Sequence, residues 1–280
     1  MHRRILERIF LDMIHEDEAL WDKTTEHIPQ TRVRAEIISK EDTHVSGIHE
    51  SKILFELFNI NVVDSADDGQ TLNSGERLFV IEGNSRDILL VERTALNILS
   101  RMCGISTTTM KAIDKAKEAG DEVIIAATRK TTPLFSYFEK KAVMVAGGDT
   151  HRLNLSDSIL IKENHRKLFG DVRESIKKIK ESKSFVDKIE IEVGNEEDAF
   201  AAAESGADIV MFDNMAPAEI REVISGLKEK GLRKNILLEA SGGINLDNIA
   251  EYAKTGVDAI SCGMLTHSTH TVDLTLRIIQ

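Results

Sequence analysis

The spacing of hydrophobic residues divides the chain into two parts with different patterns. In the first part, four segments carry apolar residues at helical spacing: 2–20, 47–59, 85–102 and 106–119. Alternating apolar residues predict strands over 32–39 and near 60–64, and residues 67–83 read as turns followed by a strand. This part is therefore expected to form a small mixed layer of helices and strands.

From about residue 120 onward, apolar strands alternate strictly with amphipathic helices. The predicted strands are 123–127, 158–161, 186–193, 209–212, 236–239 and 259–261. The predicted helices between them are 134–145, 171–182, 196–204, 217–229 and 246–254. Strands rich in Val and Ile without polar alternation are buried on both faces, which is typical of a parallel sheet covered by helices. We expect an open, incomplete α/β barrel, and a doubly wound sheet is the alternative.

The two patterns together predict an α/β protein with two domains. The first is an α+β, sandwich-like domain over residues 1–104, and the second is the α/β barrel over residues 105–267. We expect the C-terminal tail, about 268–280, to pack back on the first domain. A chain of 280 residues is long enough to bury a large core in this way.

Each predicted strand of the barrel has, at or just past its C-terminal end, a residue suited to binding or catalysis. These residues are Arg129, Lys162, Glu192, Asp213, Ser241 and Gly263. In a βα-barrel the carboxyl ends of the strands converge on one face, where active sites are found. The pattern therefore predicts a single site at that face.

The formal net charge is -11, yet residues 128–165 hold Arg129, Lys130, His151, Arg152 and Lys162. An acidic protein that gathers cations at the ends of apolar segments is typical of a pocket for a small anion. A pI near 5.4 argues against nucleic-acid binding. His151 is a candidate base, metal ligand or anion donor, and the lack of a second His at ligand spacing argues against the metal.

Two glycine-containing turns, 240–244 and 261–264, follow the last two predicted strands. Ser241, Gly242, Gly243 and Gly263 there are expected to cradle a phosphate, with Asn245 capping the next helix.

Glu192 and Asp213 are the acidic residues at strand ends, and three roles compete for them. They could bind Mg²⁺ directly or through water, stabilise a cationic transition state, or form salt bridges. Glu190 lies on the same strand face as Glu192 and is a possible substitute for it.

The cysteines and the lengths of the apolar segments indicate the cellular compartment. Cys103 and Cys262 lie far apart and fit no metal or disulfide pattern, which indicates a reducing cytoplasm. No window has the apolar length of a membrane span, and the N-terminus is too charged for a signal peptide, so no membrane partner is expected.

Eight segments, taken together and in this order, resemble the quinolinate phosphoribosyltransferases, also called carboxylating nicotinate-nucleotide pyrophosphorylases. They are 92–97 (ERTALN), 128–133 (TRKTTP), 147–152 (GGDTHR), 160–165 (LIKENH), 191–194 (IEVG), 212–215 (FDNM), 241–244 (SGGI) and 261–268 (SCGMLTHS). The resemblance covers nearly the whole chain. It implies transfer of phosphoribose from 5-phosphoribosyl-1-pyrophosphate to quinolinate, with loss of CO₂, in NAD biosynthesis. It also implies Mg²⁺ and a homodimer, or an assembly of dimers, with shared active sites.

The resemblance also implies roles for individual residues. Quinolinate would be held by Arg129, His151, Arg152 and Lys162, and by Arg93 from the neighbouring subunit, although Arg93 by pattern alone reads as a solvated helix charge. The phosphoribosyl donor would be held by Lys130, Glu192, Asp213, Ser241, Gly242, Gly243 and Gly263. Catalysis would rest on Lys130, Lys162, Glu192 and Asp213, the last two beside the metal.

Two alternatives stay open at this point. Glu163 and Phe212 stand where the family more commonly has aspartate and leucine, so a paralogue with a different acceptor is one alternative. Such a paralogue could use nicotinate, or resemble the pyrophosphorylase-like protein of molybdate transport operons. The other is a phosphometabolite-binding barrel that has lost turnover.

Overall fold

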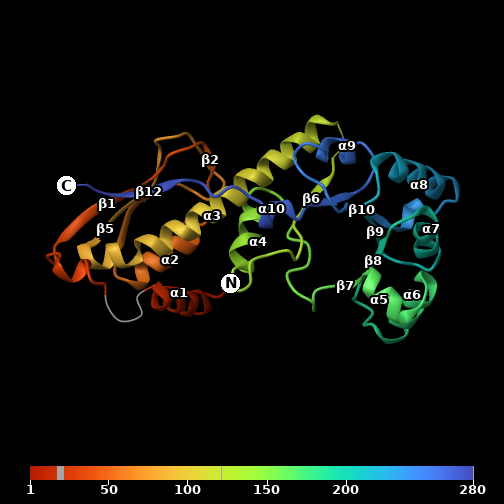
Figure 1. Ribbon diagram of the computed structural model, residues 1–280, viewed down its shortest axis with the longest axis horizontal. Helices are drawn as coiled ribbons and strands as arrows, with labels where there is room; N and C mark the ends of the chain where they lie inside the picture. The colour runs from red at the N-terminus through yellow and green to blue at the C-terminus, as the bar shows by residue number, and fades with distance from the viewer. Residues whose placement is uncertain (18–21, 121, 280) are drawn as a thin grey trace. The chain divides into compact units, whose positions relative to one another are not determined.

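The structure is a computed structural model that describes residues 1–17, 22–120 and 122–279. The chain forms two compact units (Figure 1). The first unit comprises Met1–Met110, Pro133–Ala146 and Thr269–Gln280, and the second unit comprises Lys111–Thr132 and Gly147–Ser268. These units differ from the predicted domains chiefly in residues 133–146, which belong to the first unit rather than to the barrel.

The first unit is built on a four-stranded antiparallel sheet. Its strands, in spatial order, are β12 (Leu274–Ile279), β1 (Arg32–Ser39), β5 (Arg77–Asn84) and β3 (Asn61–Ser65). The unit also contains β2 (Thr43–His44) paired with β4 (Thr71–Leu72), the 3₁₀ helix η1 (Thr25–His27), and helices α1 (Arg3–Asp17), α2 (Ile48–Leu57) and α4 (Ser136–Val145). The C-terminal strand β12 pairs with β1, so the end of the chain completes the sheet of the first unit.

Helix α3 (Ser85–Glu118) is a single element where the sequence pattern predicts two helices, 85–102 and 106–119. Gly104 lies inside it and does not break it. A Cβ at Gly104 would lie 2.0 Å from the carbonyl oxygen of His270. Gly104 is therefore required for the close approach of the C-terminal segment, because no other residue leaves room for that backbone.

Helix α4 packs within the first unit because its apolar and polar side chains both find partners there. The rings of Phe138 and Phe10 of α1 are 6.0 Å apart, centre to centre. The hydroxyl of Tyr137 donates to Oε1 of Glu50 at 2.9 Å. The helix predicted over 134–145 thus exists, but it covers the first unit and not the barrel sheet.

The second unit is built on a six-stranded parallel sheet. In spatial order the strands are β6 (Ile124–Ala126), β11 (Ala259–Ser261), β10 (Leu237–Ser241), β9 (Ile209–Asp213), β8 (Ile189–Val193) and β7 (Ile159–Ile161). The connections from β7 to β11 contain helices α5 (Glu163–Phe169), α6 (Val172–Ser182), α7 (Glu196–Glu204), α8 (Pro217–Glu229) and α9 (Ile249–Ala253), with η2 (Arg233–Asn235). Helix α10 (Met264–His267) follows β11.

The strand order identifies this sheet as an open barrel. From β7 to β11 each strand pairs with the next one in the sequence, and β11 then pairs with β6. A doubly wound sheet would reverse direction partway across, so that alternative is wrong. The predicted strands occur because their side chains are buried on both faces. In β8, Ile189, Ile191 and Val193 on one face and Glu190 on the other are all buried.

A short segment extends the sheet beyond β6. Asp149 forms a parallel bridge with Ala126, and backbone hydrogen bonds of 2.8 Å join Ala127 N–H to the Asp149 carbonyl and Asp149 N–H to the Ile125 carbonyl. The residues that follow, His151 and Arg152, are therefore carried to the open edge of the sheet.

Other predicted elements hold with small changes of boundary. The helix predicted over 2–20 is observed as Arg3–Asp17, and residues 18–20 lie outside the described part of the chain. Helices α5 and α10 and strand β12 have no counterpart among the predicted elements. Within the described residues, no helix is both long enough and apolar enough to cross a membrane.

Gly104→Ala should destabilise the protein by about 2–3 kcal/mol, because the new methyl group would collide with the backbone at His270. Thermal unfolding of the variant measures this. Asn97→Ala is the matched control, since Asn97 is exposed on the same helix and its loss should change stability by less than about 0.5 kcal/mol. Equal stability of Gly104→Ala and the wild-type protein would show that the C-terminal segment does not pack against α3.

Candidate active site

The structure places the predicted strand-end residues at one edge of the parallel sheet. Glu192, Asp213 and Ser241 lie within the last two residues of β8, β9 and β10, and Lys162 follows β7 directly. Arg129 and Gly263 come three and two residues after β6 and β11. Because neighbouring strands run parallel and in register, with Ser241 opposite Asp213, these residues share the carboxyl edge of the barrel.

Lys162 and Glu192 form an ion pair across the ends of β7 and β8. The side chain of Glu192 is 14% exposed and that of Lys162 is 46% exposed. Lys162, predicted to bind quinolinate, and Glu192, predicted to bind the phosphoribosyl donor, therefore neutralise each other's charge. The exposed Lys162 can turn toward an anion in the site without leaving a charge deeply buried.

The Ser241–Gly243 turn is held from two sides. Its Gly242 has φ +93°, and a Cβ there would lie 2.4 Å from Oδ1 of Asn214, so only glycine fits beside Asn214. On the other side, Nδ2 of Asn248 donates to the Gly243 carbonyl at 3.2 Å. The turn is a fixed element, and space is open next to Gly243.

The prediction that Asn245 caps the following helix holds in its hydrogen bonds but not in the position of the helix start. Oδ1 of Asn245 accepts the N–H of Asp247 at 2.8 Å, and its carbonyl accepts the N–H of Ile249 at 3.0 Å. Helix α9 begins at Ile249 with Asn248 at its N-cap position. The N–H of Asn245 donates to Oδ1 of Asn248 at 2.8 Å, so the intervening residues form a hydrogen-bonded turn. Backbone groups of the turn, rather than a helix N-terminus, are therefore what this loop offers to an anion.

Lys130 lies against the last glycine loop. A Cβ at Gly263 would approach Cδ of Lys130 to 2.9 Å, and the buried hydroxyl of Thr266 donates to the Lys130 carbonyl at 2.6 Å. The loops that follow β6 and β11 thus meet. In the next pair, the hydroxyl of Ser261 donates to that of Ser241 at 2.9 Å, which joins the ends of β11 and β10.

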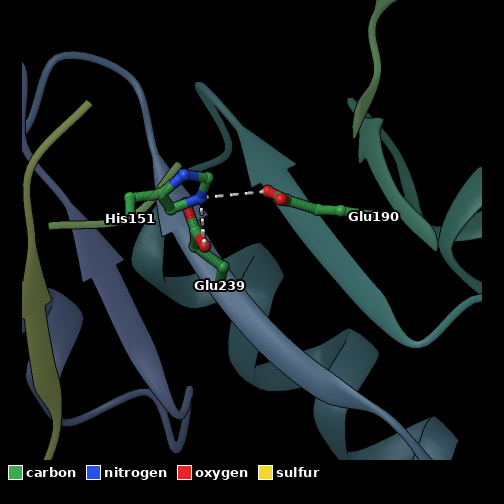
Figure 2. Close-up of side chains that lie close together, drawn as sticks. All are labelled: His151, Glu190 and Glu239. Atoms are coloured by element: carbon green, nitrogen blue, oxygen red, sulfur yellow. Dashed lines mark ion pairs between the residues drawn. The ribbon is translucent and has the colours of Figure 1, made fainter. Parts of the chain in front are cut away.

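His151 reaches between two carboxylates inside the sheet (Figure 2). Its Nε2 lies 3.5 Å from Oε1 of Glu190 on β8 and 3.4 Å from Oε2 of Glu239 on β10. Glu190 is 1% exposed and Glu239 is 4% exposed, so both carboxylates are removed from water. Such burial costs several kcal/mol for each charge unless partners offset it, which makes the imidazole N–H an important partner.

The pKa values of this cluster follow from burial and neighbouring charge. Burial alone would lower the pKa of His151, but hydrogen bonds and charge from Glu190 and Glu239 outweigh it and raise the pKa to about 9. Burial raises the pKa of Glu190, and the nearby charge of Glu239 adds to the rise. Burial lowers the pKa of Arg152, the Glu190 carboxylate opposes this shift, and the neighbouring charge of Arg129 reinforces it.

The three ligand-type atoms of His151, Glu190 and Glu239 lie within 4.8 Å of one another, close enough to share a metal ion. The hydrogen bonding of the ring argues against one. The backbone N–H of Arg152 donates to Nδ1 of His151 at 2.8 Å, so the single lone pair of a neutral imidazole is on Nδ1. Nε2 then carries the proton and has no lone pair for a metal.

A cavity of about 430 Å³ opens beside the ends of β8 and β9. Glu192 and Asp213 line one part of it, and the cations Arg166 and Lys167 of α5 line another. Arg166 is held in place by Asp198, with Nη2 and Oδ2 separated by 2.6 Å. The cavity can receive a group that carries both a sugar and negative charge.

Two residues of this region have no role in the sequence prediction, Glu239 and Arg166. Glu239 precedes Ser241 by two residues on one strand and so shares its face, a signal that the pattern contains. Arg166 lies on α5, which the pattern does not predict. Arg93 lies exposed on α3 in the first unit, and its role in binding the acceptor stays a prediction.

Comparison with known proteins gives consistent matches over the whole chain. Residues 22–103 match the N-terminal domain of quinolinate phosphoribosyl transferase, and residues 105–277 match its C-terminal domain. A probable carboxylating nicotinate-nucleotide pyrophosphorylase of Methanothermobacter thermautotrophicus is 45% identical, over 96% of this chain and 98% of its own. The human carboxylating nicotinate-nucleotide pyrophosphorylase is 35% identical, over 80% of this chain and 75% of its own.

Solved structures agree. The nicotinate-nucleotide pyrophosphorylase from Francisella tularensis superposes with a TM-score of 0.92 at 32% identity, covering 100% of this chain and 98% of that one. The corresponding protein from Ehrlichia chaffeensis gives a TM-score of 0.90 at 29% identity, covering 97% and 98%.

The charge state of His151 is open to direct measurement. Its NMR titration midpoint should be about 9 in the wild-type protein, because two carboxylates favour the charged ring. In Glu239→Gln one carboxylate is lost while burial remains, so the midpoint should fall. The raised pKa adds stability that is fully present below the unfolded value and is lost as the pH rises toward 9. A wild-type midpoint at or below the ordinary histidine value would contradict this.

Proposed function

Because the chain belongs to the quinolinate phosphoribosyl transferase family, we propose that it is a decarboxylating phosphoribosyltransferase of NAD biosynthesis. It transfers phosphoribose from 5-phosphoribosyl-1-pyrophosphate to quinolinate, and the products are nicotinate mononucleotide, pyrophosphate and CO₂. The observation that carries the proposal is the row of residues, Lys162, Glu192, Asp213 and Ser241, at neighbouring ends of one parallel sheet. Their chemistry suits two anionic reactants held side by side.

The acceptor is assigned to the cations at the open edge of the barrel. Arg129, Arg152 and Lys162 would bind the two carboxylates of quinolinate, with His151 beside Arg152. Guanidinium groups suit this task because their planar donors match a carboxylate in two places. Burial is the main cause of the lowered pKa of Arg152, and the charge of Arg129 adds to it, so a dianion between the two would relieve their repulsion.

The donor is assigned to the remaining residues of the same edge. Lys130 would meet the pyrophosphate, and Ser241, Gly242, Gly243 and Gly263 would hold the 5′-phosphate. Contact between Lys130 and Gly263 supports one continuous donor site. The fixed geometry of the 241–243 turn supports it as well, since a rigid loop loses little entropy when it binds an anion.

Glu192 and Asp213 also fit a magnesium ion. Both carboxylates line the same cavity, and Mg²⁺ is commonly held by one or two carboxylates together with substrate phosphates and water. We therefore assign the metal to this pair, directly or through water. When bound, Mg²⁺ would neutralise charge on the pyrophosphate leaving group.

The residues act by position and charge. The pyridine nitrogen of quinolinate attacks the anomeric carbon as the bond to pyrophosphate breaks, and positive charge develops on the ribose. Glu192 and Asp213 stabilise that charge, and the cations hold the two anionic reactants together against their mutual repulsion. The cationic pyridinium product then stabilises the electron pair left when CO₂ departs, and a proton takes its place on the ring. None of these steps requires a covalent bond to the protein.

We further propose a homodimer, or an assembly of dimers, in which Arg93 of one subunit completes the acceptor site of its neighbour. Arg93 is exposed on α3, and this exposure supports a role in contact with a neighbouring subunit. A reducing compartment, the cytoplasm, is also proposed, since Cys103 and Cys262 are both free and buried.

The direct test of the function supplies purified protein with donor and Mg²⁺, and with either quinolinate or nicotinate. We expect nicotinate mononucleotide and CO₂ from quinolinate, with at least about 100-fold lower efficiency for nicotinate, which leaves one cation of the site unpaired. Glu192→Gln should abolish most of the activity. Product from nicotinate alone would favour a different acceptor, and product from neither would contradict the proposed function.

Arg93 is tested by mixing two inactive variants, Arg93→Ala and Glu192→Gln, under conditions where subunits exchange. If sites are shared, a mixed dimer contains one intact site, so random mixing should restore about one quarter of wild-type activity. Absence of recovery after confirmed exchange would show that Arg93 does not act across the dimer.

A further inference from the structure

Two buried carboxylates beneath the acceptor site have no part in the proposed function. Glu190 on β8 and Glu239 on β10 point from neighbouring regions of the sheet toward the same imidazole (Figure 2). Neither forms an ion pair with a lysine there within the described residues. Oε1 of Glu190 and Oε1 of Glu239 are both buried without a hydrogen bond among them, so the contact of Glu190 with His151 is an ion-pair contact at 3.5 Å. Burying a carboxylate costs free energy of desolvation, so the partner that Glu190 and Glu239 share indicates what the two carboxylates do.

That partner is the Nε2–H of His151. Because Nδ1 accepts the N–H of Arg152 at 2.8 Å, the neutral ring carries its proton on Nε2. This proton lies between the two carboxylates, at 3.5 Å and 3.4 Å from the nearest oxygen of each. A second proton on Nδ1 would leave Nε2–H between the carboxylates but would remove the acceptor of the Arg152 N–H. The carboxylates therefore hold the ring in either charge state, and the Arg152 N–H holds it in the neutral state alone.

The ring is the anchor of a strained turn. His151 has φ +50°, a conformation that residues with a Cβ seldom adopt, and its N–H donates to Oδ1 of Asp149 at 2.6 Å. The next residue is Arg152, which is 8% exposed and donates from Nη1 to the Ser158 carbonyl at 3.1 Å. Without its anchor the turn can relax toward an unstrained backbone, and Arg152 would move with it.

We propose that Glu190 and Glu239 are positioning residues of the acceptor site, which hold the Nε2–H of His151 and thereby fix the turn that carries Arg152. The proposal rests on the proposed function in one respect, that Arg152 meets a carboxylate of the acceptor. In the neutral ring both nitrogens of His151 contact the protein, so the ring holds the turn that carries Arg152.

Glu239 gives the cleaner test, because Glu190 also acts on Arg152 through its charge. Glu239→Met removes the oxygen that accepts from His151, whereas Glu239→Gln keeps an oxygen there. Glu239→Met should raise KM for quinolinate about tenfold, as expected for one lost hydrogen bond to a charged acceptor, with the donor KM within about twofold of wild type. Glu239→Gln should recover most of the difference. Glu50→Gln, a fully buried glutamate in the first unit, is the matched control and should leave both KM values unchanged.

A double variant tests whether Glu239 acts through His151. His151→Phe keeps a ring but removes both nitrogens, so adding Glu239→Met to it should raise the quinolinate KM no further. Additive effects of the two substitutions, or equal rises in the KM values of both substrates, would overturn the proposal.

The tautomer of His151 provides a measurement that needs no activity. Long-range proton–nitrogen NMR spectra of the wild-type protein should show Nε2 protonated throughout the pH range in which the protein is folded. An unprotonated Nε2 would overturn the proposal, even if Glu239→Met fails to fold. If Nε2 is protonated but quinolinate is not a substrate, the proposed function fails while the anchoring of His151 by the two carboxylates stands.

Discussion

Parallel pairing of six strands in sequential order is the constraint on which the site depends. Backbone hydrogen bonds fix the register, so that Ser241 lies opposite both Asp213 and Ser261. Neighbouring strands are about 4.8 Å apart, which sets the spacing of the side chains at their ends. Residues separated by more than a hundred positions in the sequence are thereby placed at distances suited to one pair of reactants. The loops add glycines and hydrogen bonds, but the sheet determines where each loop begins.

Charge balance is the second constraint. A site that gathers cations for anionic ligands must remain stable before the ligands arrive. The protein meets this need with internal carboxylates: Glu192 pairs with Lys162, and the charge of Glu190 favours the ionised form of Arg152. Lys162 is nearly half exposed, so it can exchange its contact with Glu192 for a contact with a ligand. Glu190 and Glu239 are buried and remain in place. In the proposed mechanism, a bound anion would take the place of Glu192 as the counter-charge of Lys162.

The sequence was informative where a pattern has one structural meaning. Short runs rich in Val and Ile, repeated between amphipathic helices, are typical of interior strands of a covered sheet, so the barrel strands and the residues at their ends could be predicted. Helix boundaries were less certain. Gly104 suggests a break between two helices, yet it serves the approach of a backbone segment 166 residues away, which no local pattern contains. Asn245 does act as a cap through its Oδ1, which accepts the N–H of Asp247, although the regular helix begins only at Ile249.

The role of Glu239 could not be predicted for a similar reason. The role of a lone glutamate in an apolar strand is not defined until the fold brings His151 to it from the segment beside β6. The resemblance to quinolinate phosphoribosyltransferases predicted the residues at the strand ends, and the geometry adds the buried Glu239 beneath them. The family resemblance and the contacts in the structure therefore identify different residues of the same region.

The central claim is that the cations at the carboxyl edge of the barrel bind a dianionic acceptor. A crystal structure of the protein with quinolinate tests it most directly. The account predicts the two carboxylates of quinolinate in contact with Arg129, Arg152 and Lys162, with the ring nitrogen directed toward Glu192 and Asp213. Quinolinate bound elsewhere, or bound at this edge without contact to either arginine, would contradict it.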